Sequence, residues 1–404
     1  MIVTFALLFI TGYCFELGDG IFTGSRVLQF FGTLPPPNDD HDTVLAALIK
    51  SGKSYSLTHK EFSADTSQGA IVIVDPFSTG AHLAEEVCKA GYACVRVFSS
   101  EDREYSPVAA KTRKDLEVDY SATIRHEDHD DDVDRAFEET LQHIKDLPFP
   151  VIAVIAGTET GIELADKLSH RLDLRSNGES NSFARRNKYI VGEYVRRAGV
   201  RAISQQLCTS EEDLDQFLSN VLTTPFKCVL KPVQSAGGED VWFCNSKEEA
   251  QTAFSRILGK KNELGRLNYG VLAQEFLTGN EYIVDTVSKN GIHKVVAIWE
   301  HDKRAVNGAK FVNFGLRLLD PSLEVCQRLF ECAEKVLHAL QIGDGPAHMK
   351  LIDTSEGPAL INVESCCHGG AGDWLKIVQE CVGYTQVTLT LDVYENGPLF
   401  DSID

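Results

Sequence analysis

The sequence predicts an α/β fold with a parallel sheet in its first half and antiparallel strands in its second half. Residues 70–98 read as strand, helix and strand with short joins, the order of a βαβ unit, whose strands are parallel. Two later pairs of apolar segments, 226–233 with 241–244 and 269–276 with 281–287, are each separated by a glycine-containing turn, as in antiparallel hairpins. The length of 404 residues indicates two or three domains.

The first half holds the elements expected of a parallel sheet. We expect strands at 70–74, 94–98 and 151–155 and helices at 81–90, 135–145 and 162–172. The polar turn 156–161 joins a strand to a helix between glycines, which is where α/β folds bind ligands. The acidic run 127–134 is interpreted as a solvated face in preference to a metal site. Residues 1–68 show no clear period and stay unassigned.

The second half continues with mixed elements. Besides the four hairpin strands, we expect helices at 182–199, 247–258 and 322–340 and strands at 200–204, 293–299, 347–353 and 359–363.

Composition and charge limit the partners. The chain is 43% hydrophobic and 24% charged, as in soluble globular proteins, and its net charge is −20. Binding to a nucleic-acid backbone needs a basic face, and none is evident, so nucleic acid is excluded as a partner. Any anion site in this chain must therefore be local.

Cysteine usage and the N-terminus bear on location. Eleven cysteines, an odd number without paired spacing, indicate reduced thiols and a cytoplasmic protein. Ile2 to Phe15 is nearly all apolar and resembles the core of a signal peptide, which keeps the secretory pathway as an alternative, but it lacks a basic flank. This segment is too short to span a bilayer, and no later run is long enough, so we expect no membrane partner.

The segment around Lys231 has two interpretations. Residues 226–244 read FKCVLKPVQSAGGEDVWFC, an apolar strand with a lysine, a glycine turn and a second strand. Gly237 and Gly238 can adopt positive φ and turn backbone N–H groups toward an anion, which would make this hairpin a lid over phosphates. The alternative is an ordinary β-hairpin with a solvated lysine.

Several motifs in order carry a family resemblance. They run from residue 70 to near the C-terminus and read VDPFSTG, AGTETGIELAD, ARRNKY, FKCVLKPVQSAGGEDV, QEFLTGNEYIVD, DKRAVNGAKFVNFG, GPAHMK and CHGGAGDW. With these motifs the chain resembles the ATP-grasp superfamily and, within it, the amino-acid ligase-like branch of carboxylate–amine ligases.

The resemblance implies a domain organisation. We expect an unassigned extension at 1–68, a Rossmann-like pre-ATP-grasp domain at 69–180, a small α+β lid at 181–265 and a C-terminal α+β domain at 266–404. Nucleotide would lie between the last two. The oligomeric state stays open, with a homodimer as one arrangement.

The resemblance also implies an ATP site. Lys188 and Lys231 match the two lysines that hold the phosphates, and compact ammonium groups suit that role. Ser235, Gly237 and Gly238 match the loop that closes over them. Backbone groups of a hinge would face adenine, and Glu281 would accept hydrogen bonds from the ribose. The hinge residues are Gln274, Glu275, Phe276 and Leu277.

The implied chemistry is activation of a carboxylate by ATP to an acylphosphate, followed by attack of an amine. The expected partners are therefore ATP and a small carboxylate or amine substrate, such as an amino acid. Catalysis would rest on positioning and on neutralising charge with Mg²⁺, lysine and arginine. Arg304 is our candidate for holding a carboxylate through two hydrogen bonds, against the alternative of an arginine in a surface salt bridge.

The chain departs from the family at its magnesium site. The family has glutamates where this chain has Lys350 and Asn362, and an arginine where it has Cys366. Since residues i and i+2 share a strand face, Asn362 and Glu364 could still hold one Mg²⁺. The adjacent Cys366 and Cys367 are interpreted as buried thiols rather than as metal ligands or nucleophiles.

Two functions remain after these departures. The first is an ATP-dependent ligase that forms a C–N bond. The second is a catalytically degenerate protein that binds nucleotide as a regulatory or scaffold subunit.

Overall fold

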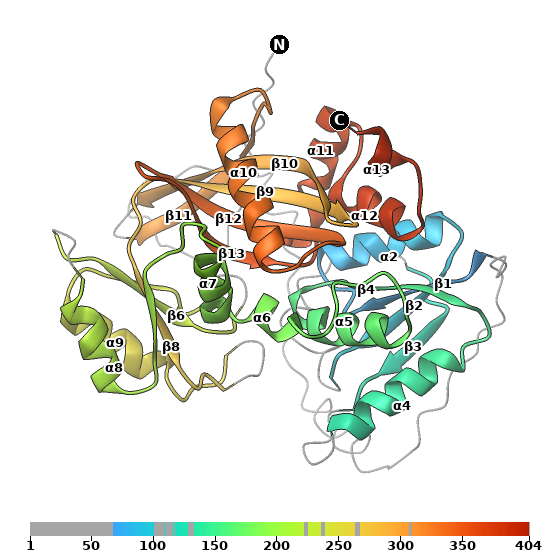
Figure 1. Cartoon of the computed structure of the whole chain (residues 1–404), viewed down its shortest axis with the longest axis horizontal. Helices are drawn as coiled ribbons and strands as arrows, with labels where there is room; N and C mark the ends of the chain where they lie inside the picture. Colours follow the sequence, from blue (N-terminus) through green and yellow to red (C-terminus); the bar gives the residue numbers. More distant parts are fainter. Residues whose placement is uncertain are drawn as a thin grey trace, which may run out of the picture. The chain divides into compact units, whose positions relative to one another are not determined.

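The computed structural model describes residues 68–403, except for 101–108, 110–115, 117, 128–132, 222–224, 236–238, 263–266 and 307–308. All described residues fall in one compact unit and build three sheets. Figure 1 shows the elements with their labels. The apolar N-terminal segment and the centre of the acidic run lie outside the described residues.

The first sheet is parallel, as predicted, with the order β3-β2-β1-β4. Its strands are β1 (Ala70–Val74), β2 (Ala93–Phe98), β3 (Ala122–Arg125) and β4 (Val151–Ala156), and its helices are α2 (Thr79–Lys89), α4 (Val133–Lys145) and α5 (Ile162–Arg171). The side chains of β1 are buried on both faces, because Ile71 and Ile73 pack with α2 while Val72 and Val74 pack with α4 and α5. Such two-sided burial explains why this strand is an uninterrupted apolar run.

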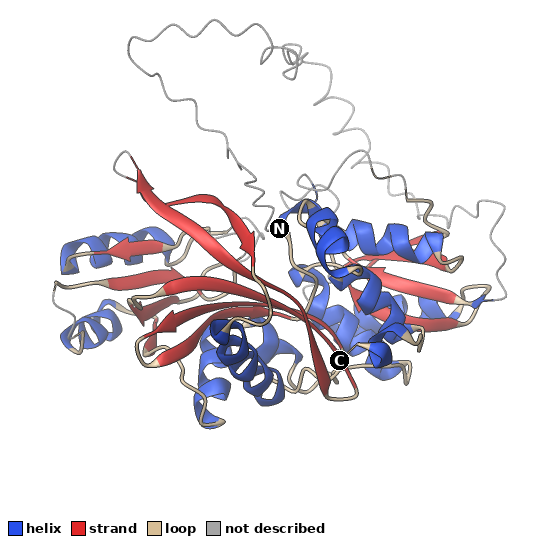
Figure 2. Cartoon of the chain, turned by 90° about the horizontal axis from the view of Figure 1, so that it is seen from above, coloured by secondary structure: helices blue, strands red, loops and turns tan. Residues whose placement is uncertain are grey.

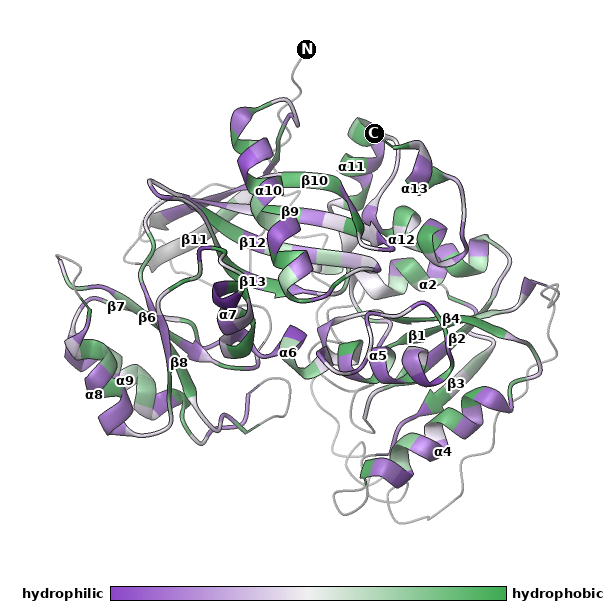
Figure 3. Cartoon of the chain, viewed as in Figure 1, coloured by the Kyte–Doolittle hydropathy of each residue, from purple (hydrophilic) through white to green (hydrophobic). Residues whose placement is uncertain are grey.

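The second sheet is antiparallel and has the order β5-β8-β6-β7. It consists of β5 (Gln205–Cys208), β6 (Cys228–Pro232), β7 (Trp242–Cys244) and β8 (Val271–Glu275), covered by α8 (Glu211–Ser219) and α9 (Lys247–Ile257). Helices α8 and α9 carry both hydrophilic and hydrophobic residues, as a helix with one buried face does (Figure 3). The prediction of a strand at 200–204 is wrong, because β5 begins only at Gln205. Strand β8 pairs with β5 and β6 and lies in a different sheet from β9, so the expected hairpin of 269–276 with 281–287 is wrong. The pairing of β8 with β6 favours a lid that extends past the proposed boundary at 265.

The third sheet is antiparallel and has the order β11-β10-β9-β12-β13. Its strands are β9 (Asn280–Lys289), β10 (Ile292–Val306), β11 (Ala309–Leu318), β12 (Gly345–Thr354) and β13 (Gly357–Glu364). One face packs on α7 (Lys188–Arg197) and α10 (Glu324–Ala339). The other packs on α11 (Leu375–Val382), α12 (Gln386–Tyr394) and α13 (Leu399–Ser402), so this sheet is a layer between helices (Figure 2).

The predicted helix at 182–199 is two helices. Helix α6 (Ser182–Arg186) ends at Asn187, whose backbone is extended, and α7 starts at Lys188. The Asn187 side chain accepts hydrogen bonds from the backbone N–H groups of Tyr189 and Ile190, both at 3.1 Å, which makes it the N-cap of α7. This break places Lys188 at the first position of a helix.

The described residues bear on the expected state of the cysteines and on membrane-spanning helices. No cysteine in this part of the chain forms a disulfide, in agreement with reduced thiols. No helix of the described ranges combines the length and the apolar character that crossing a membrane would require.

Candidate functional site

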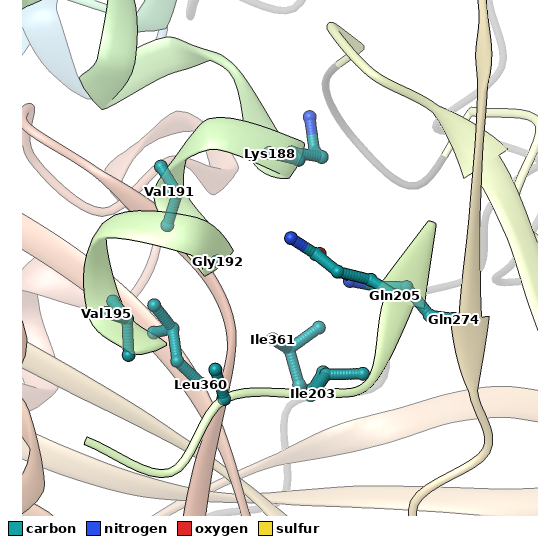
Figure 4. Close-up of a pocket in the computed structure, with 10 residues that line it drawn as sticks. Lys188, Val191, Gly192, Val195, Ile203, Gln205, Gln274, Leu360 and Ile361 are labelled. Carbon is teal, nitrogen blue, oxygen red and sulfur yellow. The ribbon is translucent and has the colours of Figure 1, made fainter. Parts of the chain in front are cut away.

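A hollow lies between α7, β5, β8 and β13, where the second and third sheets meet (Figure 4). Its empty volume is about 250 Å³, part of which is open to solvent. Apolar side chains form most of its wall, while Lys188, Gln205 and Gln274 supply polar groups. The apolar residues are Val191, Val195, Ala202, Ile203, Leu360 and Ile361. An apolar pocket with a few polar groups is the usual form of a small-molecule site.

Gln205 connects the walls of this hollow. Its side-chain amide donates to Tyr189 O at 2.7 Å, and its oxygen accepts from Gln274 Nε2 at 3.1 Å. A Cβ on Gly192 would lie 2.4 Å from Gln205 Nε2, so a larger residue at position 192 would displace the Gln205 side chain.

Of the predicted hinge residues, Gln274 lines the hollow. The carboxylate of Glu275 accepts from Ser204 N at 2.8 Å, so the side chains of Gln274 and Glu275 both hold β8 to β5. Leu277 is half-buried in the link between β8 and β9. Contact between adenine and the backbone of this hinge stays a prediction.

Lys231 lies on β6 and is only 5% exposed, which contradicts the interpretation as a solvated lysine. Its Nζ is 3.5 Å from Ile361 O on β13. Burial, together with the positive charges of Lys188 and Lys350, lowers the pKa of Lys231 to about 7. The positive charges of three lysines from distant parts of the chain therefore act at one place. Such a local concentration of positive charge is typical of an anion site.

The loop after β6 contacts Lys188. Lys188 Nζ donates to Ser235 O, and Lys188 N donates to Val233 O at 3.2 Å. Ser235 itself is buried. The predicted loop residues Gly237 and Gly238 lie outside the described residues.

Glu281 is the second residue of β9 and is half-buried rather than exposed. His301 Nδ1 is 2.9 Å from its carboxylate, and Lys303 Nζ donates to both oxygens at 2.6 and 2.7 Å. Burial alone would raise the pKa of Glu281, but these hydrogen bonds and the Lys303 charge outweigh burial and lower it to about 2. The carboxylate is thus ionised and can accept further hydrogen bonds.

Asn362 and Glu364 meet on one face of β13, as the strand period predicted. Asn362 Nδ2 donates to Glu364 Oε1 at 2.9 Å. On the neighbouring β12, Lys350 is the register partner of Asn362, and His348 is that of Glu364. The sheet therefore offers one carboxylate and one amide oxygen beside an ammonium group.

Arg304 lies on the surface. Its guanidinium donates to Asp302 at 2.8 and 2.5 Å and lies over the Phe314 ring, while its side chain is 62% exposed. This geometry is that of the alternative, a surface ion pair. A role for Arg304 in holding a carboxylate stays a prediction.

One buried polar cluster, centred on Asp285, was not predicted from the sequence. Asp285, fully buried on β9, lies 2.8 Å from His348 Nδ1 and 2.9 Å from His368 Nδ1, and accepts from Trp299 Nε1 at 2.9 Å. The two imidazoles stack with centroids 4.2 Å apart. The signal in the sequence was the aspartate inside the apolar run of β9, because a buried carboxylate needs donors.

Cys366 and Cys367 are buried, as expected. Burial is the main cause that raises the pKa of both thiols, so both stay protonated and are poor ligands and nucleophiles.

Comparisons with known proteins agree with this geometry. Residues 224–375 match the ATP-grasp domain family. The chain is 34% identical over 323 residues to dapdiamide A synthase from Enterobacter agglomerans, covering 79% of this chain and 71% of that protein. It is 26% identical to the alanine–anticapsin ligase of Bacillus amyloliquefaciens, covering 79% and 67%.

Solved structures show the same fold. An L-amino acid ligase from Bacillus licheniformis superposes with a TM-score of 0.59 at 18% identity, covering 81% of this chain and 74% of that one. The ADP complex of an N5-carboxyaminoimidazole ribonucleotide synthetase also has a TM-score of 0.59, at 15% identity over 82% and 78% of the two chains. The chain therefore belongs to the ATP-grasp family, in its amino-acid ligase branch.

Proposed function

We propose that this protein is an ATP-dependent ligase that joins the carboxylate of one small molecule, an amino acid in the simplest case, to the amine of another. The observation that carries the proposal is the hollow with Lys188 at its edge and the buried Lys231 beside β13, in a chain whose relatives include ligases. One of those relatives is named for joining alanine to anticapsin, and another for acting on L-amino acids.

The nucleotide would occupy the hollow and the lysine cluster. The purine would pack against the apolar side chains of α7 and β13 that line the hollow, with Gln274 beside it. Lys188 and Lys231, with the loop from Ser235 to Gly238, would hold the phosphates. Glu281, whose charge is among those that act on Lys231, would accept hydrogen bonds from the ribose.

The reaction has two steps. A carboxylate oxygen of the substrate attacks the γ-phosphorus of ATP, the bond to the β-γ bridging oxygen breaks, and ADP leaves. The neutral amine of the second substrate then attacks the acylphosphate carbon, the amine loses a proton, and phosphate leaves with the former carboxylate oxygen. Both steps involve crowded negative charge, so fixed cations accelerate them by electrostatic stabilisation.

The donor set supports one Mg²⁺ rather than two. Mg²⁺ prefers one or two carboxylates combined with phosphate oxygens and water, and Glu364 with the Asn362 amide supplies such ligands. Lys350, opposite Asn362, would weaken the binding of this ion and stands where the family resemblance leads one to expect a carboxylate that a second ion would need. When bound, the ion would neutralise charge on the phosphates.

The test is phosphate release from ATP by the full chain across a panel of amino acid pairs. The ligase predicts release that depends on an amino acid pair and an amide product of the corresponding mass. Tight ATP binding without release for any pair would instead support the degenerate, nucleotide-binding alternative.

Nucleotide affinity is expected to depend on pH through Lys231. Its pKa is about 7 in the free protein, and bound phosphate raises it, so above pH 7 binding takes up a proton. ADP affinity should therefore be flat below pH 7 and fall up to about tenfold per pH unit above it, until the pKa of the complex is reached. Titration calorimetry from about pH 6 to about pH 9 measures this slope. A pH-independent affinity would show that Lys231 does not contact the phosphates.

Replacing Glu364 by alanine is expected to weaken the effect of Mg²⁺ on ATP binding. The substitution removes the only carboxylate of the proposed site, so the gain in affinity on adding Mg²⁺ should shrink about tenfold or more, while affinity without Mg²⁺ should change little. A matched control is Glu356→Ala, at an exposed turn between β12 and β13. An unchanged Mg²⁺ effect in Glu364→Ala would rule out this metal site.

A further inference from the structure

Arg186 is a buried arginine, and three of its five N–H groups lie on nitrogens without a hydrogen-bond partner among the described residues. It ends α6, and only 3% of the residue is exposed. Its Nη1 lies 3.1 Å from Glu163 Oε1 of α5, whereas Nε and Nη2 are buried and have no hydrogen-bond partner among the described residues. Leaving such donors unpaired costs about 1–3 kcal/mol each, more for a charged group.

The neighbouring arginine shows that this fold can satisfy a buried guanidinium. Arg185 is 1% exposed and uses all three of its nitrogens. Nη1 donates to Asp166 Oδ2 at 2.6 Å and to Gly178 O at 3.0 Å, and Nε donates to Leu340 O at 3.3 Å. Nη2 donates to Asn177 O and, at 3.4 Å, to Gln341 O. Two adjacent residues of one short helix are thus equally buried, yet only Arg186 keeps an unused edge.

The two nitrogens without a hydrogen-bond partner lie on the same edge of the guanidinium. Nε and Nη2 form one side of the planar guanidinium, the fork that binds two oxygens of a carboxylate or a phosphoryl group in parallel. Glu163 holds the opposite end through Nη1, which fixes the orientation of the fork. An arginine held at one end and open along this edge is the arrangement of an anion receptor.

The fork lies next to the proposed reaction centre. Helix α6 packs against β13, and Arg186 is separated from Lys188 only by the N-cap residue Asn187 (Figure 1). The Arg186 charge also acts on the Cys366 thiol, two residues after Glu364, which places the guanidinium near the end of β13. Position 366 is where the family resemblance leads one to expect an arginine, and Cys366 is a buried, neutral thiol.

We propose that the Nε–Nη2 edge of Arg186 binds an anionic oxygen pair of the reacting groups, either the transferred phosphoryl group or the substrate carboxylate. Arg186 then supplies from α6 the positive charge that Cys366, just after β13, cannot supply. The inference rests on the proposed ligase function and assigns a residue to its charge stabilisation. Glu163 contacts Nη1, so the ligand must bind along the open edge, away from that contact.

The experiment compares lysine substitutions at the two adjacent arginines in the full chain. Arg186→Lys keeps a charge but loses the fork, and Arg186→Met loses both. We expect kcat of Arg186→Met to fall about 10²-fold or more, with a smaller loss for Arg186→Lys and melting temperatures close to that of the unmodified protein. Arg185→Lys, the matched control, should lower the melting temperature and leave kcat within about threefold at a temperature where it is folded.

Binding measurements identify the oxygen pair. If the fork holds the phosphoryl group, Arg186→Met weakens binding of a non-hydrolysable ATP analogue and leaves ADP unchanged. If it holds the substrate carboxylate, both nucleotides bind as before and the KM for the carboxylate substrate rises. A kcat within about threefold of the unmodified protein with unchanged analogue affinity and KM, or a loss of kcat that only follows a loss of folded protein, would overturn the proposal.

Failure of the proposed function has a different signature. If the unmodified protein releases no phosphate with any amino acid pair, the ligase assignment fails. In that case the proposal for Arg186 is tested by binding alone, through the ratio of the affinity for the ATP analogue to the affinity for ADP. A lower ratio in Arg186→Met than in the unmodified protein supports the fork as a phosphate receptor, and an unchanged ratio overturns it.

Discussion

Replacing Lys231 by methionine is expected to remove most of the nucleotide affinity while leaving the protein as stable as before, or more stable. A charge-assisted hydrogen bond contributes about 1.5–3 kcal/mol, so ADP affinity should fall about 10- to 150-fold, and turnover at fixed ATP should fall with it. Without a ligand the buried ammonium is unfavourable, because burial and the charges of Lys188 and Lys350 oppose its protonation. Methionine of similar length relieves that cost.

The paired measurements are ADP titration and thermal melting. Lys247→Met is the matched control, since Lys247 is an exposed residue at the start of α9 on the same sheet, and it should change neither quantity. A Lys231→Met protein that binds ADP normally would show that this lysine does not contact phosphate. A large loss of melting temperature would instead show that Lys231 is needed for folding.

Replacing Asp285 by alanine is expected to cost about 3–5 kcal/mol of the free energy of unfolding, the range for breaking a buried charged network by removing one member. The substitution leaves Trp299 Nε1 and the Nδ1 atoms of His348 and His368 without their acceptor. Urea unfolding measures the loss. His368 connects this cluster to the first sheet, because Thr79 Oγ1 on α2 donates to His368 O at 2.6 Å.

Asp302→Ala is the comparison for that result. Asp302 also pairs with a cation, but its partner Arg304 is exposed, and exposed ion pairs contribute about 0–1 kcal/mol. Equal, small losses for both variants would contradict the structural role of Asp285. Asp285→Asn, which keeps the shape but only one acceptor oxygen, should lie between the two.

Short sequence patterns were sufficient to predict much of the fold. The apolar runs of β1, β2 and β4 and the hairpin of β6 with β7 were predictable because strand period and glycine turns are encoded within a few residues. The break between α6 and α7 was missed because no proline or glycine marks it. Its signal was Asn187, a good N-cap residue whose side chain turns the chain into a new helix.

The candidate site was predictable only where motifs fix it. Lys188, Lys231 and the hinge were identified through the family resemblance, and the pairing of Asn362 with Glu364 through strand period. The burial of Lys231 and its proximity to Lys350 depend on the third sheet meeting the second, which no local pattern encodes. The open fork of Arg186 was invisible for the same reason, because its distinction from Arg185 lies entirely in what surrounds each side chain.

Activation through an acylphosphate is tested most directly by following the oxygen that leaves the substrate. With a carboxylate substrate labelled with ¹⁸O and an amine partner that supports turnover, one labelled oxygen per amide bond should appear in the released phosphate, detected by mass spectrometry. Amide formed with unlabelled phosphate would contradict activation through an acylphosphate, and with it the role assigned to the lysine cluster and the Arg186 fork.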